Sequence, residues 1–230
     1  MLSGGLDSSV VLAQQINRVG VPNVYPLSFN YGQRHNRELL AVEYQLNQYN
    51  IPQENRKTIH LTYFSSLITN SSLINHNIDV QSIKTTVGEA QPLEHVPFRN
   101  IQFLSIAAAH AENVGAREIY YGAAAVDTHS GHWDCSLDFL RLVNEIFALN
   151  RKHSIQLIAP LITLSKAEII QLGASFAVDF SNTYTCYKGE EIACGKCSAC
   201  SSRIKGFIDA KIIDPMKYRI YVDWSKYGCS

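Results

Sequence analysis

The chain has 230 residues, of which 46% are hydrophobic, enough for one α/β domain with a substantial core and a small appendage. Lysine plus arginine and aspartate plus glutamate both number 20, so the formal net charge is zero. That balance excludes the strong overall field of a duplex-binding protein and gives no strong nucleic-acid signal, although it leaves room for a local basic patch. No run approaches the ~18 apolar residues of a membrane span and no basic-then-apolar leader is present, so we expect a cytoplasmic protein without a membrane partner.

The first motif along the chain is Ser3-Gly4-Gly5-Leu6-Asp7-Ser8-Ser9, directly before an apolar helical run. Paired glycines let an anion approach the backbone, and the helix after them directs unpaired N–H groups and its positive dipole end at that anion. The serines add hydroxyl donors. A common Gly-Gly turn with polar caps is the alternative, but the full string favours a phosphate site. Asp7 would hold Mg²⁺ or cap the helix.

Only Met1 and Leu2 precede this motif, whereas a phosphate loop of this kind normally follows a buried strand. We expect either that the strand is a stub or that the start of the chain has been lost or misassigned. The Gly-Lys-Ser/Thr ending of the other common ATP loop is absent. A loop without that lysine suits release of pyrophosphate rather than transfer of the γ-phosphate.

Further along, apolar patterns of helical and strand period alternate. We expect helices over residues 8–17, 35–49, 101–113, 136–149, 165–173 and 201–210. We expect strands over residues 24–29, 58–62, 118–124 and 156–162. Residues 64–96 lack periodicity and are interpreted as a long functional loop or lid with short local structure. The alternation predicts an α/β fold with a doubly wound parallel sheet.

The cysteines cluster in a C-x7-C-x2-C-x2-C pattern made by Cys186, Cys194, Cys197 and Cys200. Gly195 lets the backbone turn so that two of these sulfurs face one point, and Cys200 would open the last helix. Four thiolates in a tetrahedral array define a closed structural Zn²⁺ site. An iron–sulfur cluster is the alternative, but the x3-Cys-Pro ending is absent. Cys135 and Cys229 are interpreted as ordinary thiols, and the aromatic residues of the tail, 211–230, as packing groups.

The Ser-Gly-Gly-x-Asp-Ser string resembles the signature of the N-type ATP pyrophosphatases, or PP-loop superfamily. In that superfamily the loop holds the pyrophosphate of ATP while a carboxylate or carbonyl is adenylated. Further motifs, in their order and spacing up to about residue 210, resemble the 7-cyano-7-deazaguanine synthase family of queuosine and archaeosine biosynthesis. They are Tyr31-Gly32-Gln33-Arg34-His35 with Glu38, Val96-Pro97-Phe98-Arg99-Asn100, Asp127 through Asp134-Cys135, and the cysteine run with Cys186-Tyr187.

That resemblance implies an adenine nucleotide alpha hydrolase-like fold, with an ATP-pyrophosphatase domain over 1–180 and a small zinc-binding C-terminal subdomain and tail over 181–230. It implies a homodimeric carbon–nitrogen ligase that uses ATP, Mg²⁺ and Zn²⁺. The ligase would convert 7-carboxy-7-deazaguanine and ammonia to 7-cyano-7-deazaguanine through adenylated intermediates, releasing AMP and diphosphate. Two alternatives stay open: another PP-loop enzyme, which thiolates tRNA or modifies another purine, and a non-catalytic zinc-containing nucleotide-binding protein.

The ATP-binding candidates form one continuous stretch: Leu2, Ser3, Gly4, Gly5, Leu6, Asp7, Ser8, Ser9, Val10, Val11 and Leu12. The catalytic candidates are Asp7, Ser8 and Arg99. The fork of Arg99 suits phosphate or a substrate carboxylate, and equally a surface salt bridge.

Candidate substrate residues stand on loops at the ends of predicted strands: Tyr31, Arg34, His35, Asp127 and Asp134. The two aspartates would accept the paired donors of a guanine-like edge, or else brace their loop. Lys166 would reach phosphate or lie in solvent. His129 and His132 would bind metal only with a third ligand and are interpreted as polar loop residues.

Overall fold

The structure, a computed structural model, describes residues 1–34, 37–82, 93–124 and 132–230. The helices are α1 (Leu6–Val19), α2 (Arg37–Gln48), α3 (Phe64–Leu67), α5 (Arg99–Val114), α7 (Leu137–Ala148), α8 (Lys166–Ser175) and α9 (Ser198–Ala210). The strands are β1 (Leu27–Asn30), β2 (Lys57–His60), β3 (Glu118–Tyr120) and β4 (Gln156–Ile158). Short 3₁₀ turns lie at Val21–Asn23, Gln53–Asn55, Trp133–Cys135, Phe180–Asn182 and Ser225–Tyr227.

The strands form two parallel pairs, β1 with β2 and β3 with β4. Met1 and Leu2 lie between the pairs. The Leu2 N–H donates to the Leu27 carbonyl at 2.8 Å, and the Met1 nitrogen donates to the Tyr120 carbonyl at 2.7 Å. The Ser28 hydroxyl donates to the Leu2 carbonyl at 2.7 Å. These two residues therefore occupy the position of a central strand and link both pairs into one layer.

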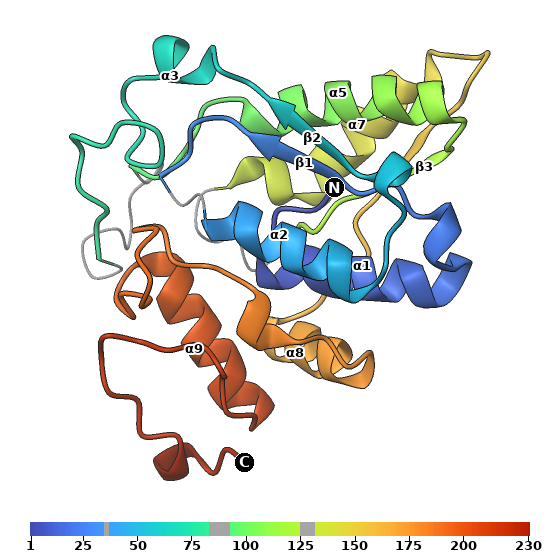
Figure 1. The fold of residues 1–230 in the computed structure, drawn as a ribbon. Helices are drawn as coiled ribbons and strands as arrows, with labels where there is room; N and C mark the ends of the chain where they lie inside the picture. Colours follow the sequence, from blue (N-terminus) through green and yellow to red (C-terminus); the bar gives the residue numbers. More distant parts are fainter. Residues whose placement is uncertain (35–36, 83–92, 125–131) are drawn as a thin grey trace.

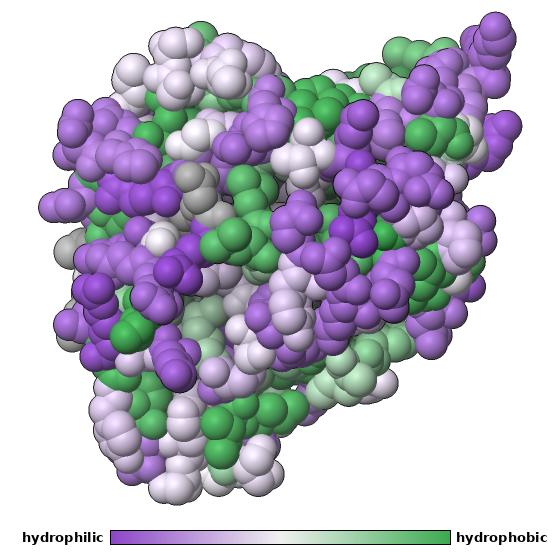
Figure 2. All heavy atoms as spheres, in the orientation of Figure 1, coloured by the Kyte–Doolittle hydropathy of each residue, from purple (hydrophilic) through white to green (hydrophobic). Residues whose placement is uncertain are grey.

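Helices cover both faces of this layer (Figure 1). On one face Leu27 and Phe29 pack against α5 and α7, and the Phe29 ring stacks on Phe103 with centroids 4.1 Å apart. On the other face α1 packs against α8 through Val10 and Ile169. The predicted α/β class with parallel, doubly wound strands is confirmed. Hydrophilic residues interrupt the hydrophobic ones over much of the face drawn in Figure 2.

Several predicted boundaries are wrong by a few residues, each for a local reason. Helix α1 begins at Leu6, two residues early, because Gly5 takes an extended conformation and serves as its N-cap. Strand β1 begins late, at Leu27, directly after Pro26, which has no N–H for a ladder. Strand β4 ends at Ile158 because Pro160, which has no N–H for a ladder, lies in the turn that follows.

Residues 64–82, the described first part of the segment interpreted as a loop or lid, are packed into the fold. Phe64 and Leu73 belong to the core beside Phe103. Ser71 and Ser72 are fully buried. The predicted short local structure is present, and the function of the segment as a loop or lid stays a prediction. Residues 83–92 lie outside the described residues.

The C-terminal part is built on α9, which packs along α8. Phe207 of α9 meets Phe180 edge to face, and both lie in the same core as Val10 of α1. The division of the chain at residue 180 therefore stays a prediction. Among the described residues, every helix is too short or too polar to cross a membrane.

Candidate active site and metal centre

A cavity of about 310 Å³ opens at the carboxyl ends of β1 and β3. Its wall combines the glycine loop before α1, the residues that follow the two strands, the first turns of α5 and α8, and the segment at 184–185. Open α/β sheets bind ligands at this edge. Of the site residues expected from the sequence, the wall contains Leu2, Ser3, Gly5, Leu6, Asp7, Ser8, Tyr31, Arg99 and Asp134.

Gly4 fixes the shape of the loop. Its φ is +81°, and a Cβ there would lie 2.1 Å from the Glu38 carbonyl oxygen of α2. The Gly4 carbonyl accepts the Tyr184 N–H at 2.9 Å, so the loop is held from two sides. Gly5 then caps α1 without a side chain, which leaves the first-turn N–H groups of the helix available to an anion.

The loop serines hold the turn closed. The Ser9 hydroxyl donates to the Gly5 carbonyl at 2.7 Å, and the Ser8 hydroxyl donates to the same oxygen at 3.1 Å. The Gly5 N–H donates to the Ser3 hydroxyl at 3.3 Å. Ser9 is buried, so in this state its contribution is to loop geometry. Ser3 and Ser8 both line the cavity.

The rest of the predicted ATP-binding stretch supports the loop from below. Val10 and Val11 lie in the core shared with α8, and Leu12 packs against α2 with Leu46. All three are buried and absent from the cavity wall. Their packing fixes the direction of α1, and through it the direction of the free N–H groups.

Lys166, at the start of α8, projects into the loop. Its Nζ donates to both carboxylate oxygens of Asp7, each at 2.9 Å. A Cβ at Gly206 of α9 would lie 2.4 Å from the Lys166 Cγ, so this glycine makes room for the lysine stem. A Cβ at Gly122 would likewise lie 3.1 Å from the Ser8 nitrogen. The loop is therefore enclosed by α8, α9 and the residue pair after β3.

Arg99 stands at the first position of α5 and faces the cavity. Its Nη1 donates to the Tyr31 hydroxyl at 3.1 Å, and its guanidinium lies over the Tyr31 ring, 5.7 Å from the centroid. Burial by itself would lower the pKa of Arg99, but the neighbouring Tyr31, Asp134 and Tyr121 raise it above its usual value. Arg99 is therefore a permanent, half-buried cation in the wall, not an exposed salt-bridge partner.

Asp134 is held by a small polar network. The Asn100 Nδ2 donates to its Oδ2 at 2.7 Å and to the Tyr121 hydroxyl at 2.7 Å, and that hydroxyl donates to the Asp134 carbonyl at 3.2 Å. Tyr121 directly precedes Gly122, which touches Ser8. The Arg99 Nε donates to the Asn100 Oδ1 at 3.2 Å, so the network connects the cation of Arg99 with the glycine loop across one cavity.

Arg34, the remaining substrate candidate among the described residues, is not brought together with this network. The Arg34 Nη2 donates to the carbonyls of Asn75 and Ile78 at 3.0 and 2.8 Å, and Arg34 is absent from the cavity wall. Its observed contacts brace the 64–82 segment. His35, Asp127 and His129 lie outside the described residues.

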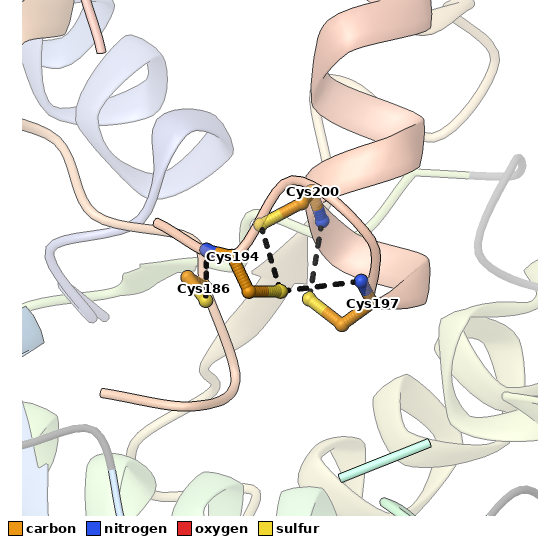
Figure 3. A group of neighbouring side chains, drawn as sticks. All are labelled: Cys186, Cys194, Cys197 and Cys200. Atoms are coloured by element: carbon orange, nitrogen blue, oxygen red, sulfur yellow. Dashed lines mark hydrogen bonds between the residues drawn. The ribbon is translucent and has the colours of Figure 1, made fainter. Parts of the chain in front are cut away.

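The four clustered cysteines are buried, and their Sγ atoms all lie within 4.8 Å of one another (Figure 3). Tetrahedral zinc with bonds of about 2.3 Å requires sulfurs about 3.8 Å apart, so the donor set fits a closed four-thiolate site. One expectation is wrong: Cys200 does not open the helix. Helix α9 begins at Ser198, and the Cys197 thiol, at the N-cap, accepts the Cys200 N–H at 3.5 Å.

Backbone donors and the tail surround this cluster. The Cys194 N–H donates to the Cys186 sulfur, and the N–H groups of Lys196 and Cys197 donate to the Cys194 sulfur, at 3.3–3.4 Å. Such donors stabilise thiolate ligands. Gly195 has a φ of +69°, as its predicted turn requires, and a Cβ there would clash with Ile220 of the tail at 2.4 Å. The tail therefore closes over the cysteine turn of its own chain.

Sequence reasoning missed several residues that complete the site. From the sequence, no individual role was assigned to Asn100, Tyr121 or Gly122. The ion pair of Lys166 with Asp7 was also missed, because the two residues are 159 positions apart in the sequence. One signal was available and it was local: Lys166 is the first residue after an N-cap serine, where a helix N-terminus meets the sheet edge.

The fold and site together define an α/β protein with a phosphate-type loop at its sheet edge and a four-cysteine metal-binding group. A family model described as "Queuosine biosynthesis protein QueC" matches residues 1–211. The chain belongs to this family.

Curated relatives match this chain over nearly its full length and nearly theirs. A 7-cyano-7-deazaguanine synthase of Thermoplasma volcanium is 41% identical over 229 residues, which covers 97% of this chain and 91% of that protein. One from Oceanobacillus iheyensis is 38% identical, covering 95% of this chain and 96% of that protein. A solved structure, the U34-tRNA thiolase NcsA from Methanococcus maripaludis with its [4Fe-4S] cluster, shares 15% identity at a TM-score of 0.48, over 89% of this chain and 62% of that one. That likeness is too distant to bear on function.

Proposed function

We propose that this enzyme is an ATP-dependent ligase that converts 7-carboxy-7-deazaguanine and ammonia to 7-cyano-7-deazaguanine, with release of AMP and diphosphate. The family and the names of its relatives favour this reaction over tRNA thiolation or a non-catalytic role. The observation that carries the mechanism is the cavity in which a Ser-Gly-Gly-x-Asp-Ser loop, Lys166 and Arg99 share one wall.

The chemistry explains why ATP is needed in two rounds. A carboxylate is a poor electrophile, and adenylation replaces its oxygen with a good leaving group. Ammonia displaces AMP to give an amide, and a second adenylation of the amide oxygen lets that oxygen depart as the nitrile forms. Each round develops charge on a leaving pyrophosphate, which fixed donors stabilise. The first-turn N–H groups of α1 and the hydroxyl of Ser3 would be such donors.

Charged residues divide the remaining work. Arg99 would orient the substrate carboxylate against the α-phosphate, since its charge is permanent and its fork matches either group. Lys166 would move from Asp7 to phosphate when the nucleotide enters. Asp7, the carboxylate of the loop, would then hold Mg²⁺ together with phosphate oxygens. Magnesium supplies counter-charge to the diphosphate when bound.

The four cysteines would hold Zn²⁺ in a structural role, because four thiolates leave the ion no open position. A cytoplasmic homodimer stays an expectation, which sedimentation of the holoenzyme would test.

The direct test is incubation of the metal-loaded enzyme with the carboxylate, ammonia and MgATP. We expect the cyano product by mass spectrometry, with two AMP formed for each nitrile. The same mixture without the carboxylate is the control for idle hydrolysis. Formation of ADP in place of AMP would contradict cleavage between the α- and β-phosphates and with it the proposed reaction.

A further inference from the structure

Glu94 is a buried acid that the sequence-based expectations did not use. It lines the same cavity and is only 3% exposed. Among the described residues, neither of its carboxylate oxygens has a hydrogen-bond partner. Its backbone is well anchored, because the Ser71 hydroxyl donates to the Glu94 carbonyl at 3.5 Å and the Ser72 N–H donates to the Leu93 carbonyl at 2.8 Å.

The surroundings of this carboxyl are unfavourable to its charge. Burial raises the pKa of Glu94 above its usual value. The backbone N–H groups of Glu94 itself and of Gln81 pull the pKa down, but they lie outside hydrogen-bond geometry and burial prevails. A buried polar group without partners destabilises the protein that holds it, so donors supplied by a ligand would remove that cost.

The position of Glu94 suits a substrate contact. Its neighbour His95 has its ring 6.4 Å from that of His132, two residues before Asp134. Five residues after Glu94, Arg99 faces the cavity, and Tyr121–Gly122 link that region to the glycine loop. A bicyclic base whose carboxylate meets Arg99 and the loop would turn its opposite, pyrimidine edge towards another part of the wall.

We propose that Glu94 is a specificity-determining residue that accepts the ring N–H and exocyclic amine of the guanine-like substrate with its two carboxylate oxygens. This inference rests on the proposed function. A guanine-like edge presents two parallel donors, and an ionised carboxylate presents two matching acceptors. Asp134, the residue expected from the sequence for this contact, already accepts the Asn100 amide at 2.7 Å and lies beside Arg99. Both oxygens of Glu94 lack a partner among the residues that the structure describes, so they are available to a ligand.

The test compares Glu94→Gln with Glu43→Gln, an exposed position on α2. Glutamine keeps the shape but turns one acceptor into a donor that opposes the base. We expect the KM for the carboxylate substrate to rise about 100-fold or more in Glu94→Gln, with the KM for ATP nearly unchanged. The melting temperature should hold or rise, because a buried charge is removed. Glu43→Gln should match the parent enzyme in the KM for the carboxylate, the KM for ATP and the melting temperature.

A substrate analogue without the exocyclic amine gives a second readout. The parent enzyme should discriminate against it strongly, and Glu94→Gln should discriminate far less. An unchanged KM for the carboxylate in Glu94→Gln would overturn the inference, as would equal discrimination by both enzymes. A joint fall in melting temperature and ATP affinity would assign Glu94 a structural role instead. Absence of product from the parent enzyme would defeat the proposed function itself, and the inference with it.

Discussion

The Nζ of Lys166 lies 2.9 Å from each carboxylate oxygen of Asp7, so the acid of the glycine loop is paired before any nucleotide binds. The pair is mostly shielded, with 13% of the lysine side chain and 23% of the aspartate side chain exposed. Each side chain compensates the charge of the other in a partly buried site that must later receive phosphate and a cation. The ion pair is therefore expected to open during each catalytic cycle.

A double-mutant cycle tests this pairing. Asp7→Asn and Lys166→Met should each destabilise the ligand-free protein by about 1–2 kcal/mol, and the double variant by less than their sum, because the two groups share one interaction. Both single variants should lower kcat by about 100-fold or more, since each removes a charge from the phosphate site. Urea unfolding and AMP release measure the two effects. Strict additivity of the stability changes would rule out the coupling.

Gly4→Ala should abolish nucleotide binding. The added Cβ would meet the Glu38 carbonyl at 2.1 Å, and the φ of +81° is already unfavourable for alanine. Gly115→Ala is the matched control, because its φ is +74° and nothing lies within 4 Å of the added atom. Both variants carry backbone strain of about 1 kcal/mol, but only Gly4→Ala should lose ATP in isothermal titration. Equal ATP affinity in the two variants would show that the loop shape is not essential.

Cys197→Ser should release the metal and lower the melting temperature, because Cys197 both supplies a ligand and caps α9. Cys229→Ser, outside the cluster, is the control and should keep a full metal content. Elemental analysis together with thermal unfolding measures both. An unchanged melting curve after complete loss of the metal would argue against a structural role for it.

Arg203 and Asp214 form a fully buried ion pair at the base of the C-terminal part. The guanidinium donates to both Asp214 oxygens at 2.8 and 2.9 Å, and also to the carbonyls of Phe180 and Thr183. Arg203→Met should destabilise the protein by about 3–5 kcal/mol because it leaves Asp214 charged and unpaired. The double variant with Asp214→Asn should recover part of that loss. Chemical denaturation measures the free energy of unfolding of each variant. If the double variant were no more stable than Arg203→Met, the hydrogen bonds of Arg203 to the backbone carbonyls would dominate over the ion pair.

His132 should make stability fall in mild acid. Burial lowers its pKa, the charges of Arg99 and His95 act in the same direction, and Asp134 opposes them. Between that lowered pKa and about 6.5, the unfolded chain binds more protons than the native state, so the free energy of unfolding decreases as pH falls through this window. His132→Gln should flatten this part of the curve. Urea midpoints between about pH 5 and pH 8 give the measurement, and parallel curves for both proteins would contradict it.

Local signals made the glycine loop and the cysteine cluster predictable. Two glycines before an apolar stripe, and thiols spaced by two residues, each specify geometry within one or two turns of chain. Partners that meet only through the fold were not predictable. Nothing near Gly4 in the sequence indicates the Glu38 carbonyl that excludes a side chain there. Nothing near Glu94 in the sequence shows that its oxygens are buried without a donor from the described part of the chain. The misplaced start of α9 has the same origin, since Cys197 serves as both ligand and cap.

The clasp between the Gly4 carbonyl and the Tyr184 N–H has a consequence for biosynthesis of the protein. The loop leaves the ribosome well before the groups that hold it, because these arrive with Lys166, Tyr184 and Gly206. A nascent chain stopped before residue 184 would carry the full glycine motif and still lack its supports. Competence to hold ATP should therefore emerge late in translation, and chains interrupted early should show no affinity for the nucleotide.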